Sequence, residues 1–310
     1  SNLQIILNKI SKKFISSEYS SLVFVSFALS ICNLYILKMK REKIFFRPNL
    51  YALVTGASSG MGREYLFQLT KMGYNVIAVS NQKEALEDAV NEAIVSFRID
   101  KNQKIVPLFI DLSQLDAYKE IIDFTKDFEI EVLINNAGVM ICRPLTLHSE
   151  EEITRLISLH DHTTVQLSKY FSKKMADRGE GYMMNISSLA AWLQYPVISI
   201  YSASKVFIKS FTRSLRCELY GSGVKVTTAY FGAVDTPLYP LSQKYRKIAR
   251  RLGIMISAEK ASKVALKALF KGKANVMPGF INRLFRPILP IIPKRVLNFA
   301  FRKAPKSIYF

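Results

Sequence analysis

Cysteine is scarce in this chain. It occurs three times in 310 residues, at Cys32, Cys142 and Cys217. An odd number of widely spaced cysteines gives neither a disulfide framework nor a zinc-binding pattern. We therefore expect a reducing compartment and no metal site. The sequence also contains no internal repeat and no low-complexity segment, and its length suffices for an ample hydrophobic core.

Acidic residues are absent from the C-terminal end. Residues 260–310 hold twelve Lys and Arg and no Asp or Glu, and residues 1–50 hold eight basic and two acidic residues. The remaining residues, 51–259, hold 24 basic and 22 acidic residues, so the net charge of +20 sits mainly in the two ends. Both ends are also rich in apolar residues. This combination favours an anionic membrane surface as partner and argues against nucleic acid.

One long stretch near the N-terminal end, residues 19–37 (YSSLVFVSFALSICNLYIL), is free of charge and largely apolar. Nineteen helical residues would span about 28 Å, close to the roughly 30 Å hydrocarbon core of a bilayer. Five basic residues follow within ten positions, at 38, 40, 41, 43 and 47. We therefore predict a membrane anchor with the rest of the chain facing the cytoplasm. The alternative is a buried helix or one that lies on the lipid.

Strand and helix patterns alternate through the body of the chain. Short apolar runs typical of buried strands are separated by helical patterns, and a capping box at Ser149–Glu152 opens a long helix that reaches about Met175. Such alternation predicts a parallel sheet covered on both faces. The expected strands are Leu50–Thr55, Asn75–Ser80, Ile105–Ile110, Glu131–Asn135, Gly181–Ile186 and Val224–Tyr230.

A glycine-rich turn, Thr55–Gly62, follows the first strand and opens the first helix. Gly56 permits a tight turn, Gly60 lets the backbone approach a pyrophosphate, and Gly62 lets helix and strand pack closely. Asp111–Leu112 ends the third strand and Asn135–Gly138 the fourth. All three segments lie at carboxyl ends of strands, where open α/β sheets bind ligands.

Tyr201 and Lys205 are four residues apart, and Ser188 precedes the tyrosine by thirteen residues. Residues four apart share one face of a helix. An ammonium one turn away favours the phenolate form of tyrosine, which makes the phenol a better proton donor at neutral pH. The hydroxyl of Ser188, at the end of a strand, would then donate a hydrogen bond to a carbonyl oxygen. A surface helix is the alternative interpretation of this spacing alone.

Together, and in this order, these motifs resemble the short-chain dehydrogenase/reductase family over roughly residues 48–278. Within it, the layout is similar to the membrane-anchored 17β-hydroxysteroid, 3-oxoacyl and 3-oxosphinganine reductase group. Phe231–Thr236 resembles a later family motif, with Phe231 in place of proline. The resemblance implies a Rossmann-type, doubly wound parallel sheet of about seven strands and hydride transfer between a nicotinamide cofactor and a carbonyl or alcohol.

The resemblance also implies residue roles. Tyr201 would be the acid and base, Ser188 would orient the carbonyl, and Lys205 would bind the nicotinamide ribose and tune Tyr201. The residues expected to contact the cofactor are Gly56, Ser58, Ser59, Gly60, Met61, Gly62, Ser80, Asn81, Asp111, Leu112, Asn136, Ala137, Gly138, Tyr201, Lys205, Val234 and Thr236.

The sequence departs from the family pattern at two places. His160 stands where many members carry an asparagine that holds a relay water, so it either takes part in that relay or is merely packed there. Ser80 ends the second strand where an NAD enzyme would usually place a carboxylate, and Asn81 and Lys83 follow. The absence of that carboxylate favours NADP (NADPH) over NAD.

We divide the chain into an N-terminal segment with the anchor (1–47), a dehydrogenase/reductase domain (48–278) and a basic apolar, amphipathic tail (279–310). The apolar residues around 189–200 and the expected lid at 231–245 favour a lipophilic ketone as substrate. The tail either lies at a membrane interface or packs on the sheet. NAD-dependent oxidation of a lipid alcohol and a non-catalytic nucleotide-binding scaffold remain alternatives, and a homodimer is left open.

Overall fold

The computed structural model describes residues 47–193, 195–238 and 243–303. Its centre is a seven-stranded sheet in the order β3-β2-β1-β4-β5-β6-β9, and all neighbouring strands are parallel. A separate pair joins β7 to β8. The strands are β1 (Leu50–Thr55), β2 (Asn75–Ser80), β3 (Ile105–Phe109), β4 (Glu129–Asn135), β5 (Gly181–Ser188), β6 (Val224–Phe231), β7 (Ala233–Asp235), β8 (Met255–Ser257) and β9 (Asn275–Val276).

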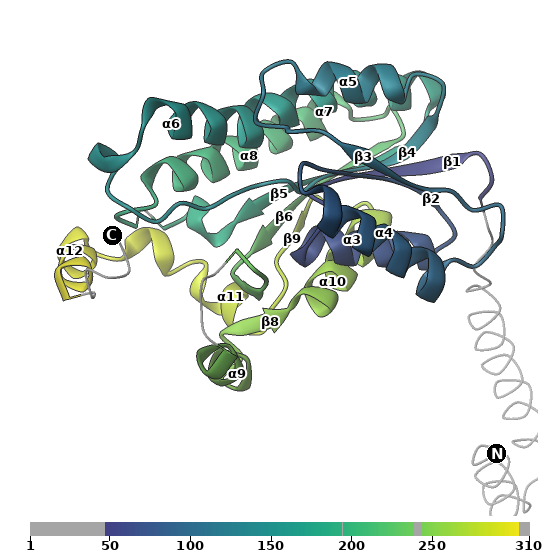
Figure 1. The fold of residues 1–310 in the computed structure, drawn as a ribbon. Coiled ribbons are helices and arrows are strands. Elements are labelled where there is room, and N and C mark those ends of the chain that lie inside the picture. The colour runs from purple at the N-terminus through teal and green to yellow at the C-terminus, as the bar shows by residue number, and fades with distance from the viewer. Residues whose placement is uncertain (1–46, 194, 239–242, 304–310) are drawn as a thin grey trace, which may run out of the picture. The chain divides into compact units, whose positions relative to one another are not determined.

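Helices cover both faces of the sheet (Figure 1). Helices α3, α4 and α10 lie on one face, and α5, α7 and α8 lie on the other. Their bounds are α3 (Gly60–Lys71), α4 (Lys83–Phe97), α5 (Ala117–Phe124), α6 (Glu150–Ile157), α7 (Thr163–Arg178), α8 (Ser199–Glu218), α9 (Gln243–Arg251), α10 (Ala258–Phe270), α11 (Phe280–Phe285) and α12 (Lys294–Lys303). The strand order reverses between β1 and β4, which makes this a doubly wound Rossmann-type sheet, as predicted.

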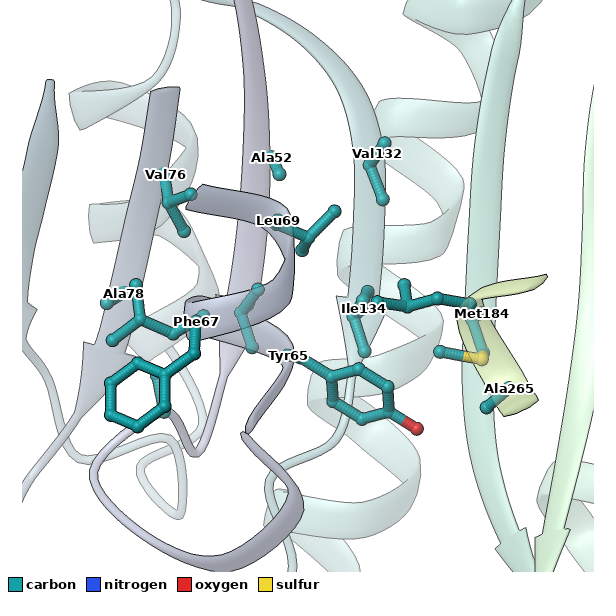
Figure 2. Close-up of a cluster of buried hydrophobic side chains, with 14 of the residues drawn as sticks. Ala52, Tyr65, Phe67, Leu69, Val76, Ala78, Val132, Ile134, Met184 and Ala265 are labelled. Carbon is teal, nitrogen blue, oxygen red and sulfur yellow. The ribbon is translucent and has the colours of Figure 1, made fainter. Parts of the chain in front are cut away.

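Apolar side chains fill two cores, one on each face of the sheet. Figure 2 shows the first, in which Tyr65, Phe67 and Leu69 of α3 lie over the strands with Ala265 of α10 beside them. Strands β1, β2 and β4 are buried nearly throughout, because helices cover both faces of the sheet, and this explains their continuous apolar runs. Every strand predicted in the sheet is confirmed. The end residues of some strands differ, since β5 runs to Ser188 and β6 to Phe231. The sequence patterns missed the short seventh strand of the sheet, β9, and the β7–β8 pair.

The predicted long helix after Ser149 is confirmed, with an interruption. Ser149 and Glu152 form both hydrogen bonds of the capping box at the start of α6. Between α6 and α7, residues Ser158–His162 form a π-helical turn, η3. Such π-helical turns inside α-helices occur frequently at functional sites. This turn carries His160 and contacts α8, where Ser204 Oγ lies 2.9 Å from His160 Nδ1.

Helices α11 and α12 follow the sheet and fall within the predicted tail. Asn282 of α11 is buried and donates a hydrogen bond to the carbonyl oxygen of Pro278 (2.8 Å), whereas Phe280, Leu284 and Phe285 are exposed. The first part of the tail therefore packs on the domain through one side and exposes apolar side chains on another. Within the ranges described above, no helix is long and apolar enough to cross a membrane. The predicted anchor at residues 19–37 lies outside those ranges.

Candidate functional site

The glycine-rich turn between β1 and α3 is shaped by two of its glycines. Gly56 has a φ of 67°, and a Cβ there would lie 2.9 Å from the Cα of Ala137. At Gly62, a Cβ would overlap the carbonyl oxygen of Gly56. Only glycine fits either position, so the turn brings the amino end of α3 directly to the carboxyl edge of the sheet. Backbone N–H groups at a helix start bind phosphate well.

Hydrogen bonds from two side chains join this turn to the segment after β4. The hydroxyl of Thr55 accepts hydrogen bonds from the backbone N–H groups of Asn136 (2.9 Å) and Ala137 (3.0 Å). In return, the side-chain amide of Asn136 donates to the carbonyl oxygen of Thr55 (3.0 Å). The Asn136 amide therefore holds the backbone of the turn. Thr55 was not singled out from the sequence, since a threonine that ends a strand carries no motif of its own.

A cleft of about 610 Å³ runs along this edge of the sheet. Most of the residues predicted to contact a cofactor line it: Gly56, Ser58, Ser59, Gly60, Met61, Ser80, Asn81, Asp111, Leu112, Asn136, Ala137, Gly138 and Thr236. Gly62 instead serves the packing described above. Gln82 and Arg155 also line the cleft, and no sequence motif pointed to them. The tight glycine turn and the cleft are suited to a dinucleotide in an extended conformation.

Hydroxyl groups cluster where β2 ends in the cleft. Ser80 Oγ donates to Ser58 Oγ (2.9 Å), and Ser58 Oγ donates to Gln82 Oε1 (3.1 Å). Lys83 Nζ lies 5.7 Å from the centre of the Phe109 ring. The end of β2 thus offers neutral hydrogen-bonding groups with a lysine close by in sequence.

Asp111 lies at the far end of the cleft, after β3. Its carboxylate accepts hydrogen bonds from the backbone N–H (3.1 Å) and hydroxyl (2.8 Å) of Ser113. Arg155 Nη2 lies 3.7 Å away. Burial alone would raise the pKa of Asp111, but the Ser113 hydrogen bonds and the charge of Arg155 outweigh it and hold the pKa below its ordinary value. Asp111 is therefore a fixed, ionised acceptor facing the cleft.

Ser188, Tyr201 and Lys205 line one small pocket of about 70 Å³ beside the cleft, together with Val234 and Thr236. Tyr201 and Lys205 lie on α8, and Lys205 Nζ is 5.5 Å from the centre of the Tyr201 ring. Ser188 Oγ donates to the carbonyl oxygen of Phe231 (3.3 Å) and accepts from the N–H of Ala190 (3.1 Å). The structure therefore brings together the three residues that the spacing singled out.

The ammonium of Lys205 is buried. It donates to the carbonyl oxygen of Ile186 (3.3 Å), and Ser187 Oγ donates to the backbone carbonyl of Lys205 (2.8 Å). Burial lowers the pKa of Lys205 to about 8, although the charge of Asp161 acts in the opposite direction. A lysine with such a pKa changes its charge near neutral pH, as residues of catalytic sites often do.

Both ring nitrogens of His160 are used by the protein. Nε2 accepts the N–H of Val139 (2.9 Å), so Nδ1 carries the proton and lies 2.9 Å from Ser204 Oγ. Burial lowers the pKa of His160 well below its ordinary value, and the charge of Lys205 lowers it further. The imidazole is therefore neutral, and its edge faces the Tyr201 ring at a centroid distance of 5.8 Å. Both predicted roles of His160, packing and participation in a relay, remain predictions.

In the segment that follows Ser188, Trp192 packs against Tyr230 at a centroid distance of 4.5 Å. Lys209 Nζ and Arg286 Cζ lie 4.5 Å and 5.0 Å from the indole centre, so the tail is linked to the segment that follows Ser188. Gly232, which lines the catalytic pocket, is in contact with Asn282 of α11, since a Cβ at Gly232 would overlap the Asn282 amide. The start of the tail therefore lies next to the pocket.

A doubly wound sheet with a glycine-turn cleft and a Ser–Tyr–Lys set defines a dinucleotide-dependent oxidoreductase of the Rossmann type. The family model for short chain dehydrogenase matches residues 50–246. The chain belongs to the short-chain dehydrogenase/reductase family, whose members are NAD(P)-dependent oxidoreductases.

Two groups of curated relatives are similar to the chain. A very-long-chain 3-oxoacyl-CoA reductase of Aspergillus terreus is 30% identical over 208 residues, which cover 66% of this chain and 59% of that protein. The 17-beta-hydroxysteroid dehydrogenase type 3 of Rattus norvegicus is 28% identical over 285 residues, which cover 90% of this chain and 85% of that protein. The chain thus spans about 60% of the length of the fungal reductases that it matches.

Solved structures support the fold. A short-chain dehydrogenase from Sphingobium yanoikuyae in complex with NADPH has a TM-score of 0.67 at 22% identity and covers 83% of this chain and 97% of that chain. A 7beta-hydroxysteroid dehydrogenase has a TM-score of 0.69 at 21% identity, with coverages of 76% and 90%. At these identities, the similarity shows a shared fold.

Proposed function

We propose that this protein reduces a ketone on a lipophilic substrate with NADPH. The observation that carries the proposal is the shared pocket of Ser188, Tyr201 and Lys205, which adjoins a cleft lined by the glycine turn. A reducible carbonyl in that pocket would lie between a hydroxyl and a phenol, with an ammonium one helical turn behind the phenol.

The residues of the pocket have distinct roles in this reaction. The Ser188 hydroxyl donates a hydrogen bond to the carbonyl oxygen of the substrate and so polarises the carbonyl group. Tyr201 transfers its phenolic proton to the same oxygen as negative charge develops there. Lys205 stabilises the phenolate that remains. The bound nicotinamide supplies the hydride. The cofactor would be held by the backbone of the glycine turn, by Asp111 at one end and by Val234 and Thr236 at the other.

NADPH is the proposed cofactor because Ser80, a neutral residue, ends β2. A carboxylate at this position would repel a 2′-phosphate, whereas the hydroxyls of Ser58 and Ser80 and the amide of Gln82 can donate to one. Lys83, at the start of α4, supplies a positive charge nearby.

The proposed substrate is a 3-oxoacyl, 3-oxosphinganine or steroid-like ketone. The names of the relatives support lipid and steroid substrates. We propose further that the protein associates with membranes, with its catalytic domain facing the cytoplasm. The exposed apolar residues of α11 and the excess of basic residues after Ala258 support a membrane surface near the pocket.

The test is turnover of a ketone panel by the purified protein, with NADPH and NADH measured side by side. We expect reduction of a long-chain or polycyclic ketone at a higher kcat/KM with NADPH. Preferential oxidation of the matching alcohols with NAD would support the alternative of a lipid alcohol dehydrogenase. Cofactor binding without turnover of any ketone or alcohol would support a scaffold. Lipid extraction from cells that lack the protein would then identify the ketone that accumulates.

A further inference from the structure

Helix α9 has no role in the mechanism above, and its two sides are arranged in reverse. A surface helix of a globular protein normally buries its apolar side and exposes its charged side. On α9 the apolar side chains are the exposed ones: Tyr245 is 61% exposed, Ile248 46%, and Leu252, which continues the last turn, 60%. They are three and four residues apart and so share one face of the helix. This apolar face is therefore uncovered within the part of the chain that the structure describes.

The charged side of α9 faces the domain instead. Arg246 Nη1 and Arg250 Nη1, one helical turn apart, donate to the two carboxylate oxygens of Asp235 at 2.7 Å and 3.0 Å. The side chains of Asp235 and Arg246 are only 19% and 17% exposed. Asp235 belongs to β7, whose Val234 lines the same pocket as Tyr201. These ion pairs therefore tie α9 to a strand that lines the pocket, with the apolar face of the helix turned outward.

Three further cations border the apolar face. Lys244, Lys247 and Arg251 are three and four residues apart, so they lie together on the side of α9 next to Ile248. All three are exposed, and none forms an ion pair with a described residue. Residues 236–258 contain no Asp or Glu. An exposed apolar face bordered by cations is typical of a helix that lies in the interface of an anionic membrane.

The exposed apolar surface continues from α9 to α11. Figure 1 shows α9 beside β8, and α11 is close to both. A Cβ at Gly253, just after α9, would lie 3.3 Å from Ile281 Cδ1 of α11. The next residue, Ile254, is exposed, as are Phe280 and Leu284 of α11. The two helices therefore contribute neighbouring parts of one exposed apolar surface.

A second copy of this chain is a poor partner for this surface. In a two-fold dimer the same surface patch meets itself, so the cations of one α9 would face those of the other. Residues 236–258 hold no acidic residue that could pair with them. Like charges across an interface cost affinity. An anionic membrane instead supplies both an apolar interior for the apolar face and negative headgroups for the cations.

We propose that α9 is an interfacial helix whose face of Tyr245, Ile248 and Leu252 inserts into an anionic membrane. The ion pairs with Asp235 then hold β7 and the pocket beside that membrane, in which a lipophilic ketone is dissolved. The inference deepens the proposed membrane association by adding α9 to the surface of α11, and it rests on the proposed function for this consequence. The placement of α9 itself is tested without turnover.

The test introduces a tryptophan on α9 and follows its contact with lipid. The chain has a single tryptophan, Trp192, so the full-length parent protein gives the background fluorescence. Ile248→Trp and the control Tyr220→Trp, at a 93% exposed position just after α8, are each mixed at low salt with vesicles of phosphatidylcholine and phosphatidylserine. Bromine atoms on the acyl chains of part of the phosphatidylcholine quench a tryptophan that reaches the bilayer.

We expect the fluorescence that Ile248→Trp adds to fall by about half or more, because an interfacial helix lies about 5–10 Å deep. The fluorescence that Tyr220→Trp adds should stay unquenched. Lys247→Glu with Arg251→Glu, made in the Ile248→Trp protein, should remove most of the quenching, because phosphatidylserine repels the reversed charges.

Quenching of Ile248→Trp no greater than that of the parent, or quenching that survives the charge reversal, would overturn the inference. If the unquenched Ile248→Trp protein sediments as a dimer, the apolar face belongs to a second copy. Quenching of Ile248→Trp in a protein that reduces no ketone would contradict the proposed function alone. Ketone reduction by a protein whose Ile248→Trp variant is unquenched would contradict this inference alone.

Discussion

His160 Nδ1 lies 2.9 Å from Ser204 Oγ, which joins the π-helical turn to the helix that carries Tyr201 and Lys205. Ser204 in turn donates to the backbone carbonyl of Tyr201 (2.8 Å). The position of Tyr201, the proposed proton donor, therefore depends on a histidine that lines neither the cleft nor the pocket described above.

Substitution of His160 should separate packing from proton relay. His160→Leu leaves the N–H of Val139 without its acceptor, at a cost of about 1–3 kcal/mol, and should lose much of the activity. If a polar group is what matters, His160→Asn should keep activity. The measurements are turnover and the free energy of unfolding, and equal activity of both variants would mean that the residue only packs.

The same histidine predicts a pH dependence of stability. In the unfolded chain His160 takes up a proton as the pH falls through about 6.5, whereas in the folded protein its pKa is well below that value. The unfolded state therefore binds more protons, and the folded protein should lose stability as the pH falls below about 6.5. Urea unfolding at pH 5 and pH 7.5 measures the effect, and the difference should shrink in His160→Asn.

Tyr201→Phe should lower kcat by roughly 10²–10⁴-fold, because the phenolic proton donor alone is removed. NADPH binding, followed by cofactor fluorescence, should persist. Tyr220→Phe, at an exposed position just after α8, is the matched control for the loss of a phenol. Near-normal turnover of Tyr201→Phe would remove Tyr201 from the mechanism.

Ser80→Asp should reverse or erase the preference for NADPH, because the new carboxylate repels the 2′-phosphate and can accept from a ribose 2′-hydroxyl. The Kd values of NADPH and NADH are the measurement. Ser96→Asp on the exposed side of α4 adds the same charge away from the cleft and should change neither. Equal affinities for the two cofactors in the parent protein would contradict the proposed choice.

Gly62→Ala should destabilise the fold by more than about 3 kcal/mol, since its Cβ would overlap the carbonyl oxygen of Gly56 and neither backbone segment can move freely. Gly221→Ala is the control, because a Cβ there meets open space. The only expected cost is the strain of an alanine at a φ of 84°, about 1–2 kcal/mol of stability. Chemical unfolding measures both, and similar losses would show that the turn can relax.

A chain that lacks residues 1–47 should still bind anionic vesicles through its tail. The exposed side chains of Phe280, Leu284 and Phe285 supply apolar contacts, and each basic residue near the surface contributes about 1 kcal/mol. Sedimentation with phosphatidylserine vesicles at low and high salt is the measurement, and binding should weaken with salt.

Phe280→Ser with Leu284→Ser should weaken that binding, whereas Val95→Ser, an exposed apolar position on α4, should not. If the truncated chain does not bind anionic vesicles at low salt, the tail only packs on the domain, and residues 19–37 would be the sole anchor.

The parts of the fold that follow from local pattern could be predicted from the sequence. Continuous apolar runs marked the buried strands, and Ser149 with Glu152 marked a helix start, because each signal lies within a few neighbouring residues. The glycine turn and the Ser188, Tyr201 and Lys205 set were equally visible, and the structure brings those three into one pocket.

What could not be predicted depends on contacts between distant segments. Nothing near His160 in the sequence indicates that Val139 and Ser204 occupy both of its nitrogens. A π-helical turn has no sequence pattern distinct from an α-helix, so the turn that carries His160 was not visible. Thr55 was missed for the same reason, since its partners lie more than 80 residues away.

The contact between Gly232 and Asn282 has a practical consequence for dissecting this enzyme. Gly232 lines the catalytic pocket, and the side chain that covers it comes from the basic C-terminal region. Cutting the chain at residue 278 would remove the side chain that packs against a lining residue of the pocket, along with a candidate lipid-binding segment. Any loss of turnover would then have two possible causes. The effects on membrane binding and on turnover can be separated by substituting exposed side chains of α11 while Asn282 is kept.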